Sequence, residues 1–460
     1  MSPPAPSTES LRPASPGRSG FLRAVIVLVS GTAMAHGISA LCMPVLARLY
    51  SPADFGLLAV FSSFLGIIAV AACLRYELAI ALPEADGDAF QLLILSLLVC
   101  TALSGLLAAI VAFMPDGLVR LLGQPQLRPY LWMAPLGLFL AGAYSALQFW
   151  HVRRRNFGLL ARTRVAQSAG SSAMQLGLGW AGISPLGLLT GYVMNTGVAC
   201  LGLGGGLLRG PHRLSWQRIR ELAFTYRRFP AFSSAEALAN SAAIQLPMIL
   251  IAAWATRAEA GHLTLAAFVA QAPLSLIGTA IGQVYLSRAP AEFRDGRLGA
   301  FTAGILGKLF KAGAGPILAL GLLAPSVFGI VFGAEWERSG WLLAWMTPWF
   351  LMQFLAVPIG LGLHVTGHLK AALMLQLGGL ALRVFMVWAA AHWMPSAVSE
   401  AYAVSGALFY LTYLVTILAA VRAPWRQVGL TFRAGLPPTL LWALGAAALS
   451  LLIQLLRASP

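Results

Sequence analysis

The stretch that decides the class of fold is Phe90-Gln-Leu-Leu-Ile-Leu-Ser-Leu-Leu-Val-Cys-Thr-Ala-Leu-Ser-Gly-Leu-Leu-Ala-Ala-Ile-Val-Ala-Phe113. None of these 24 residues is charged. A helix needs about 20 apolar residues to cross the hydrocarbon core of a bilayer. The whole chain has a similar composition, since 58% of its 460 residues are apolar and 10% are charged. Soluble domains are about 45–50% apolar and about 25% charged, so we expect a polytopic membrane protein.

The formal net charge of +16 does not indicate a nucleic-acid-binding protein. The basic residues occur in short clusters between apolar runs, as in Arg153-Arg-Arg155, and not along one folded domain. In a membrane protein, such clusters set the topology and contact anionic headgroups. We therefore expect anionic phospholipids at the cytoplasmic face as partners, and no nucleic acid.

The sequence carries no signature of a cofactor, a metal site or an enzyme. The cysteines lack metal-ligand spacing, and the chain contains neither the phosphate-binding motif G-x-x-x-x-G-K-[ST] nor a nucleophile elbow. We predict no cofactor, no metal and no catalytic residue. The enzymatic alternative is a membrane glycosyltransferase or polymerase, which the short and nearly uncharged outer loops disfavour.

Thirteen apolar runs are long enough to cross a bilayer. They cover residues 24–47, 57–82, 90–113, 131–150, 165–183, 186–208, 231–254, 263–286, 305–331, 341–365, 371–393, 401–421 and 436–456. This pattern predicts an all-α polytopic membrane protein with about 12–13 transmembrane helices. We divide the chain into a disordered cytoplasmic tail (1–20), an N-lobe (21–208), a cytoplasmic linker (209–230), a C-lobe (231–422) and a final segment with an additional transmembrane helix (423–460).

The basic residues predict the orientation. With the N-terminus in the cytoplasm, 24 Lys and Arg lie on the cytoplasmic side and 6 on the outer side, as the positive-inside rule requires. The linker contains the amphipathic stretch Leu214-Ser-Trp-Gln-Arg-Ile-Arg-Glu-Leu-Ala-Phe224. It is typical of a short helix on the inner membrane surface, although a solvated linker is an equally simple interpretation.

The first and seventh spans begin an internal repeat. Pro44 lies late in the first span and Gly56 opens the second, while Pro247 and Gly261 take the corresponding places in the second half. An even number of spans in each half makes the halves parallel repeats, and transporters commonly build a substrate path between such halves. We therefore expect two six-helix lobes around a central cavity.

Several stretches also carry a family resemblance. These are Pro44-Val-Leu-Ala-Arg-Leu-Tyr-Ser-Pro-Ala-Asp-Phe-Gly56, Leu74-Arg-Tyr-Glu-Leu-Ala-Ile-Ala-Leu-Pro83, Gln271-Ala-Pro-Leu-Ser-Leu-Ile-Gly-Thr-Ala-Ile-Gly-Gln-Val-Tyr285 and Phe332-Gly-Ala-Glu-Trp-Glu-Arg-Ser-Gly340. They resemble bacterial Wzx-type lipid-linked oligosaccharide (O-antigen/polysaccharide) flippases of the multidrug/oligosaccharidyl-lipid/polysaccharide exporter superfamily. The resemblance extends over residues 21–421.

The resemblance implies a definite activity and location. The protein would move an undecaprenyl-diphosphate-linked oligosaccharide from the inner to the outer leaflet of the bacterial cytoplasmic membrane. The product would serve surface polysaccharides such as lipopolysaccharide O-antigen, with other polysaccharide assembly proteins as further partners. A cation-coupled drug antiporter of the same superfamily is the alternative.

Ionisable residues inside the spans are the candidate site, because a polar headgroup needs a wet path through hydrocarbon that penalises charge. Arg383 lies well inside the span 371–393, where an arginine costs roughly 2.5–3.5 kcal/mol on insertion. We predict that it faces a cavity and contacts the diphosphate. The alternative is that Arg383 pairs with a carboxylate such as Glu236 and only locks two helices together.

The seventh span is unusually polar. Glu236, Asn240 and Gln245 recur near helical spacing and predict a wet face in the substrate path, with hydrogen bonds between lobes as the alternative. Glu236 and Glu77 are the candidates for binding a coupling ion. Weaker candidates of the same polar kind are His36, Gln175, Asn195, Gln271, Gln283, Gln353 and Gln376.

Arg75 and Glu77 lie near the cytoplasmic end of the second predicted span. Residues two apart point to different sides of a helix, so we expect that these two side chains do not neutralise each other. Arg75 then either assists Arg383 in the substrate path or extends to the inner headgroups.

Two groups near the outer ends of spans have structural interpretations. Arg48 and Asp54 are expected to bond each other or to cap the following helix. A tryptophan group is expected to anchor the chain at the outer interface. Its members are Trp336, Trp341, Trp345 and Trp349.

Overall fold

The structure is a computed structural model that describes residues 18–205 and 214–458. Within these two ranges the chain forms helices and turns and no strand. The predicted tail lies almost entirely outside the described residues, and the first helix already includes its last three positions, since it begins at Arg18.

Each predicted span corresponds to a long helix. The long helices of the described residues are α1 (Arg18–Leu49), α2 (Pro52–Ala69), α4 (Asp86–Phe113), α6 (Met133–Arg153), α7 (Phe157–Trp180), α8 (Leu186–Gly204), α10 (Ser234–Trp254), α11 (Arg257–Arg294), α12 (Leu298–Val331), α13 (Glu337–Ala356), α15 (Leu369–Trp393), α16 (Val398–Ala420) and α17 (Trp425–Ala458). By length and composition, 10 helices of the described residues could cross a membrane. Helices α6 and α7 are also long enough but less apolar.

Short helical turns connect the long helices. They are α3 (Tyr76–Ala79), α5 (Pro115–Leu122), η1 (Pro125–Tyr130), α9 (Trp216–Thr225), η3 (Phe229–Ser233), η4 (Ala334–Trp336), η5 (Val357–Ile359), α14 (Gly362–Val365) and η6 (Pro395–Ala397).

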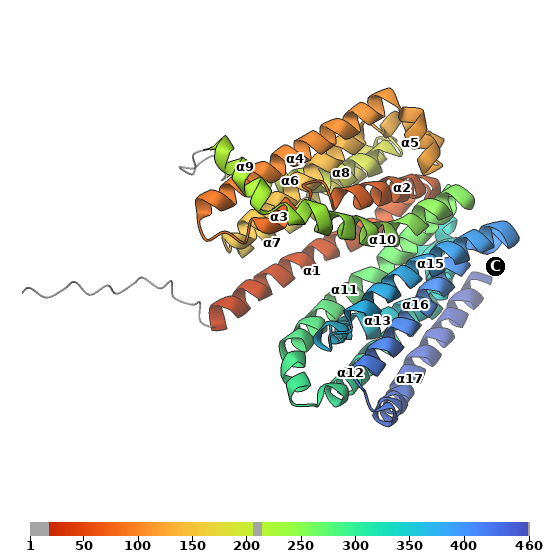
Figure 1. The fold of residues 1–460 in the computed structure, drawn as a ribbon. Coiled ribbons are helices and arrows are strands. Elements are labelled where there is room, and N and C mark those ends of the chain that lie inside the picture. The colour runs from red at the N-terminus through yellow and green to blue at the C-terminus, as the bar shows by residue number, and fades with distance from the viewer. Residues whose placement is uncertain (1–17, 206–213, 459–460) are drawn as a thin grey trace, which may run out of the picture.

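The helices form two bundles (Figure 1). Helices α4, α6 and α8 lie together in the first bundle, in which α1 packs against α7. Helices α11, α12, α13, α15 and α16 form the second bundle, and α17 packs along α12 at its edge. The all-α fold class is therefore confirmed, and the last apolar run is a full-length helix of the second bundle.

Helix α2 shows how the sequence sets a helix start. It begins at Pro52, whose fixed φ suits the first turn, directly after the N-cap Ser51. Ser51 and Asp54 form a capping box, which confirms the predicted cap. Arg48 does not pair with Asp54, because its guanidinium donates instead to the Ile330 carbonyl at 3.0 Å.

The prediction that residues 57–82 form one continuous span is wrong. Helix α2 ends at Ala69, and the chain turns through Leu74 and Arg75, with φ of 48° and 63°, before α3 begins. The left-handed conformation is unfavourable for residues with a Cβ and cannot continue a right-handed helix. Hydropathy does not depend on backbone conformation, so the hydropathy of residues 57–82 does not reveal the break between α2 and α3.

The interface anchor predicted from the tryptophan group is wrong for two of its members. Trp341 and Trp345 are about half exposed, but Trp336 is 1% exposed and Trp349 is 8% exposed. Each helical residue turns about 100°, so Trp349 is rotated by about 80° from Trp341 and faces the inside of the bundle. The Trp336 ring lies between Phe55 and His262, at centroid distances of 5.0 and 5.6 Å.

The two bundles meet through a reciprocal pair of glycines. A Cβ added to Gly56 of α2 would lie 1.9 Å from the carbonyl oxygen of Arg257, and one added to Gly261 of α11 would lie 1.9 Å from that of Pro52. Only glycine allows two backbones to approach so closely. Gly56 and Gly261 hold corresponding positions in the predicted internal repeat, so the two copies of the repeat contact each other.

Two further contacts across the same junction are also reciprocal. Gln124, after α5, donates from Nε2 to the Ala252 carbonyl of α10 at 2.7 Å. Trp336, after α12, donates from Nε1 to the Ala47 carbonyl of α1 at 2.7 Å. We call these four residues (Gly56, Gly261, Gln124 and Trp336) the outer seam, because the predicted topology places these helix ends on the outer side.

Candidate substrate cavity

A cavity of about 570 Å³ lies between the two bundles, beside the outer seam. It is bounded by α2, α10, α11, α13, α15 and α16, and its lining begins at Ala59, one helical turn from Gly56. Its polar lining residues are Ser62, Ser63, Asn240, Gln245, Thr264, Gln271, Gln353, Gln376 and Arg383. Thr264 of α11 lies one turn from Gly261 in the same way, so the cavity lies between the two repeats and next to the seam.

Arg383 of α15 lines the cavity while being only 7% exposed. Its guanidinium carbon lies 4.5 Å from the Phe409 ring centroid and 6.0 Å from that of Trp349. Its Nε has no hydrogen-bond partner, and no carboxylate of the described residues, Glu236 included, lies within ion-pair distance. The charge is therefore held by aromatic faces, which attract cations, and no protein anion neutralises it.

The wet face predicted on the seventh span is only partly present. Asn240 and Gln245 line the cavity, but Glu236 does not and is exposed. Glu236 lies in the first turn of α10, more than one turn before Asn240, where a carboxylate interacts favourably with the positive end of the helix dipole. Helical spacing aligned the three residues on one face, but the cavity does not extend to the start of the helix.

Arg75 and Glu77 do not line the cavity, and the prediction that they cannot neutralise each other is wrong. Arg75 Nη1 lies 3.8 Å from Glu77 Oε1. The prediction assumed a helix, whereas Arg75 has φ of 63° and stands just before α3, so both side chains can turn to one side. Glu77 is 3% exposed and its Oε2 has no partner among the described residues, as is also true of Arg75 Nε.

The weaker polar candidates fall into separate groups. Gln271, Gln353 and Gln376 line the same cavity as Arg383. Gln175 and Asn195 line a different cavity of about 320 Å³ within the first bundle, and His36 is exposed. The side chain of Gln283 lies outside the described residues.

Known proteins agree with this architecture. The family described as "Polysaccharide biosynthesis protein" matches residues 45–340, which is more than half of the chain. The chain belongs to this polysaccharide biosynthesis protein family. The match includes α2, α10, α11 and part of α13, so four of the six helices around the cavity fall wholly or partly in the region that defines the family.

Solved structures show the same fold. A lipid II flippase MurJ in an inward closed conformation is 11% identical, with a TM-score of 0.71, over 95% of this chain and 98% of that one. A MOP superfamily transporter from Pyrococcus furiosus is 14% identical, with a TM-score of 0.55, over 87% of this chain and 97% of that one. An inward-facing multidrug resistance transporter of the MATE family is 14% identical, with a TM-score of 0.54, over 86% and 98%. Among curated proteins, none matches this sequence.

These matches confirm the resemblance seen in the sequence. This member of the polysaccharide biosynthesis protein family is a multi-pass membrane protein with the fold of flippases and transporters. At 11–14% identity, the solved structures establish the fold and not the cargo.

Sequence reasoning missed the aromatic part of the cavity. Trp349 on α13 and a group on α16 line it, the latter consisting of Tyr402, Phe409, Tyr410 and Tyr413. The other three α16 residues lie seven, eight and eleven positions after Tyr402, which places all four on one helical face. That periodicity was available in the sequence, but the same pattern is also typical of an ordinary buried core.

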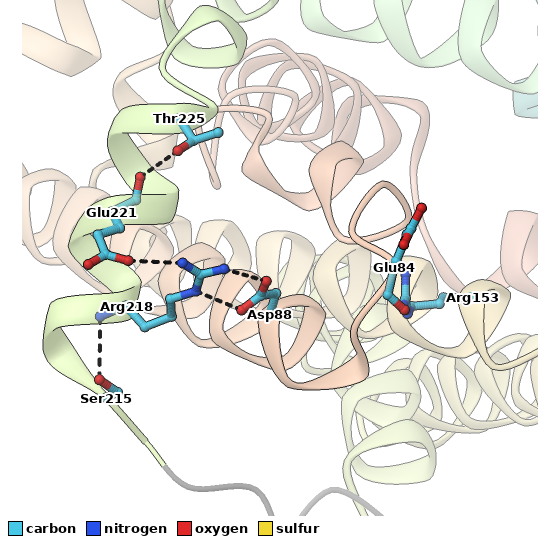
Figure 2. Close-up of polar contacts among 7 residues, drawn as sticks. All are labelled: Glu84, Asp88, Arg153, Ser215, Arg218, Glu221 and Thr225. Carbon is cyan, nitrogen blue, oxygen red and sulfur yellow. Dashed lines mark hydrogen bonds and ion pairs between the residues drawn. The ribbon is translucent and has the colours of Figure 1, made fainter.

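A polar cluster at the other end of the first bundle was also missed (Figure 2). Arg218 of α9 donates to both Asp88 oxygens of α4, at 2.8 and 2.7 Å, and to Glu221 at 2.9 Å. The hydrogen bond with Asp88 raises the pKa of Arg218, which keeps this side chain charged. Ile219 and Leu222 are buried beside it. The predicted amphipathic helix is therefore present, but it packs on α4 through both its apolar and its charged residues.

Arg153, at the end of α6, makes hydrogen bonds to the loop that precedes α4. It donates to the carbonyls of Pro83 and Glu84, at 2.6 and 3.1 Å, and to the Asp86 carboxylate at 3.0 Å. This arginine belongs to the cluster that the sequence assigned to topology alone. In the structure, Arg153 also holds the end of α6 against this loop.

Proposed function

We propose that this protein moves an undecaprenyl-diphosphate-linked oligosaccharide from the inner to the outer leaflet of the bacterial cytoplasmic membrane. The product would be used for surface polysaccharide such as lipopolysaccharide O-antigen. The observation that carries the proposal is the unneutralised charge of Arg383 in the cavity between the bundles. Together with Asn240 and Gln245, it would form the path of the diphosphate headgroup.

The physical argument rests on charge in a medium of low polarity. A diphosphate is anionic, and a positive charge surrounded by protein attracts it far more strongly than one in bulk water. A single arginine binds the headgroup without forming a cage that would prevent its release. The lipid tail meanwhile remains in the hydrocarbon, so only the polar part enters the cavity.

The family supports this cargo over a cationic drug, because the family model that matches this chain describes polysaccharide biosynthesis proteins. The lipid II flippase MurJ matches this fold with a TM-score of 0.71, and the multidrug resistance transporter matches it with a TM-score of 0.54. A cavity whose only lining charge among the described residues is Arg383 would repel a cationic drug. We retain the drug antiporter as the alternative, and the experiment below tests it.

We further propose the surroundings of this path. The chain would divide into a cytoplasmic tail, two lobes, a linker and a final helix at the boundaries expected from the sequence, with the N-terminus in the cytoplasm. Arg220 and Arg227, exposed on and beside α9, would contact anionic phospholipids. Other polysaccharide assembly proteins would receive the exported unit.

The coupling ion is proposed to bind away from the headgroup. Neither Glu77 nor Glu236 lines the cavity. Glu77, buried with one unpartnered oxygen and next to Arg75, is the better of the two candidates for taking up a proton. Arg75 would then act on Glu77 and would not assist Arg383 with the diphosphate.

The test is substitution of Arg383 in a strain that depends on this protein for surface polysaccharide. We expect Arg383→Ala to reduce surface glycan at least tenfold, the size of a lost buried charged hydrogen bond, and to leave lipid-linked glycan at the inner leaflet. Arg383→Lys should retain part of the activity, because the point charge remains while the guanidinium fork is lost.

The control is Arg433→Ala, which removes an exposed arginine from α17. Normal export by a membrane-inserted Arg383→Ala variant would refute the cationic path. If Arg383→Ala does not accumulate in the membrane while Arg433→Ala does, Arg383 instead has a structural role. Export of a cationic dye by the wild type would favour the antiporter.

A further inference from the structure

The cavity has one wall of a different chemical kind from the rest. Helices α2 and α10 contribute serine and amide side chains, whereas α13 and α16 contribute aromatic rings and, on α13, the amide of Gln353. Trp349 and Tyr402 meet edge to face at 5.1 Å and 89°, and Phe409 stacks on Tyr413 at 6.0 Å and 6°. We call Trp349, Tyr402, Phe409 and Tyr413 the aromatic wall.

Packing alone does not explain this wall, because polar atoms next to it lack partners. Trp349 Nε1 and Gln353 Oε1 are both buried without a hydrogen bond among the described residues. An unmade buried hydrogen bond is costly, and native proteins leave few such groups. Both side chains line the cavity, so a ligand there is the group that can complete their hydrogen bonding.

The two unpartnered atoms are complementary to one chemical group. Trp349 Nε1 is only a donor and Gln353 Oε1 is only an acceptor, and the residues stand four apart on one face of α13. A hydroxyl accepts from the first and donates to the second. Both atoms are shielded from water in this conformation, so side-chain rotation, which is common on binding, must bring them to the hydroxyl.

A sugar ring combines such hydroxyls with a face of C–H groups. The face of an aromatic ring carries partial negative charge and attracts the weakly positive hydrogens of that C–H face. Ligand sites typically join aromatic surface with a few placed polar groups in this way. The wall and the two unpartnered atoms together therefore match a carbohydrate better than a lipid chain, which would leave the polar atoms unsatisfied.

The position of Arg383 determines which sugar would bind. Its guanidinium carbon lies 4.5 Å from the Phe409 ring and 6.0 Å from the Trp349 ring. A diphosphate held by Arg383 would thus stand directly beside the wall. The ring that reaches the wall is the one joined to the diphosphate.

We propose that the aromatic wall, with Trp349 Nε1 and Gln353 Oε1, is a subsite for the sugar attached directly to the diphosphate of the lipid-linked substrate. The subsite rests on the proposed flippase function. It adds a recognition of carbohydrate that is separate from the attraction of charge by Arg383.

The experiment compares two probes on the full-length protein in lipid nanodiscs. The probes are undecaprenyl diphosphate and undecaprenyl-diphosphate-N-acetylglucosamine, and their dissociation constants are measured for each variant. We expect the wild type to bind the sugar-bearing lipid more tightly, by tenfold or more. Trp349→Phe keeps the ring but loses the N–H, and should reduce this preference by about fivefold, as for one neutral hydrogen bond.

Gln353→Met, which keeps the length and loses the acceptor, should have a similar effect. In both variants the affinity for the sugar-bearing lipid should fall more than the affinity for undecaprenyl diphosphate, so the ratio of the two dissociation constants is the readout. The matched control is Trp345→Phe, on the same helix but about half exposed and outside the cavity. An unchanged preference in both Trp349→Phe and Gln353→Met would refute the sugar subsite, even if Arg383→Ala weakens both probes.

The outcomes separate the subsite from the proposed function. If Arg383→Ala leaves the binding of both probes unchanged, the charge-based function fails, whatever Trp349 does. If the wild type binds the two probes equally, the wall is not a subsite for N-acetylglucosamine. The comparison is then repeated with undecaprenyl-diphosphate-galactose and undecaprenyl-diphosphate-glucose, and equal binding there refutes a hexose subsite. Thermal unfolding of each variant confirms that the fold is intact.

Discussion

The outer seam makes a sharp prediction about Gly56. In Gly56→Ala, the new Cβ would stand 1.9 Å from the carbonyl oxygen of Arg257, whereas real Cβ contacts essentially never fall below 3.0 Å. The partner is a backbone atom of α11, so no side chain can rotate away. Helices α2 and α11 must therefore separate by at least about 1.1 Å.

The energetic consequence can be given as an order of magnitude. Overpacking of this kind costs about 1–3 kcal/mol. Only conformations with the seam closed bear this cost, so the population should shift toward an open seam by about five- to 150-fold. The matched control is Gly105→Ala in α4, where nothing lies within 4 Å of the added Cβ. That change should stabilise the helix by about 0.5–1 kcal/mol.

The assay uses a cysteine placed in the cavity. Ser62→Cys lines the cavity beyond the seam, and a membrane-impermeant maleimide added outside intact cells should label it slowly. Combining it with Gly56→Ala should increase the labelling rate about tenfold, while Gly105→Ala should not change it. The native cysteines, measured without Ser62→Cys, give the background. Equal labelling and equal thermal stability in the two glycine variants would refute the reasoning.

Other predictions concern topology, coupling and the linker helix. Reporter fusions after Arg155, Arg228 and Arg297 should be cytoplasmic and those near Gln124 and Glu335 periplasmic; a periplasmic signal at Arg228 would invert both lobes. Glu77→Gln should abolish the ion dependence of transport while Glu236→Gln should not, and ion dependence unchanged in both variants would exclude them as ion sites. Asp88→Asn should loosen α9 from α4, which is measured as faster proteolysis after Arg220. Asp116→Asn, which removes the exposed ion pair between α5 and Arg128, should leave that cleavage rate unchanged.

The sequence was sufficient for the properties that depend on composition and short periodicity. Each long apolar run contains a long helix, because a backbone in lipid must satisfy its hydrogen bonds within the segment, although the helix of the run 57–82 ends at Ala69. The cap of α2 and the amphipathic helix α9 also follow from local chemistry, which neighbouring residues determine. Arg383 could be identified as a cavity residue because burial in hydrocarbon leaves an arginine few other environments.

Tertiary structure decided what depends on residues far apart in the chain. The break before α3 brings Arg75 to Glu77 through left-handed backbone that hydropathy does not encode. Trp336 is part of the seam because its indole N–H donates a hydrogen bond to the Ala47 carbonyl, which lies 289 residues away in the sequence. Gly56 and Gly261 were recognisable as repeated residues, but their mutual contact appears only when the two bundles are packed. The aromatic wall likewise needs α13 and α16 side by side, since a cavity is a property of space between helices and no single helix carries its pattern.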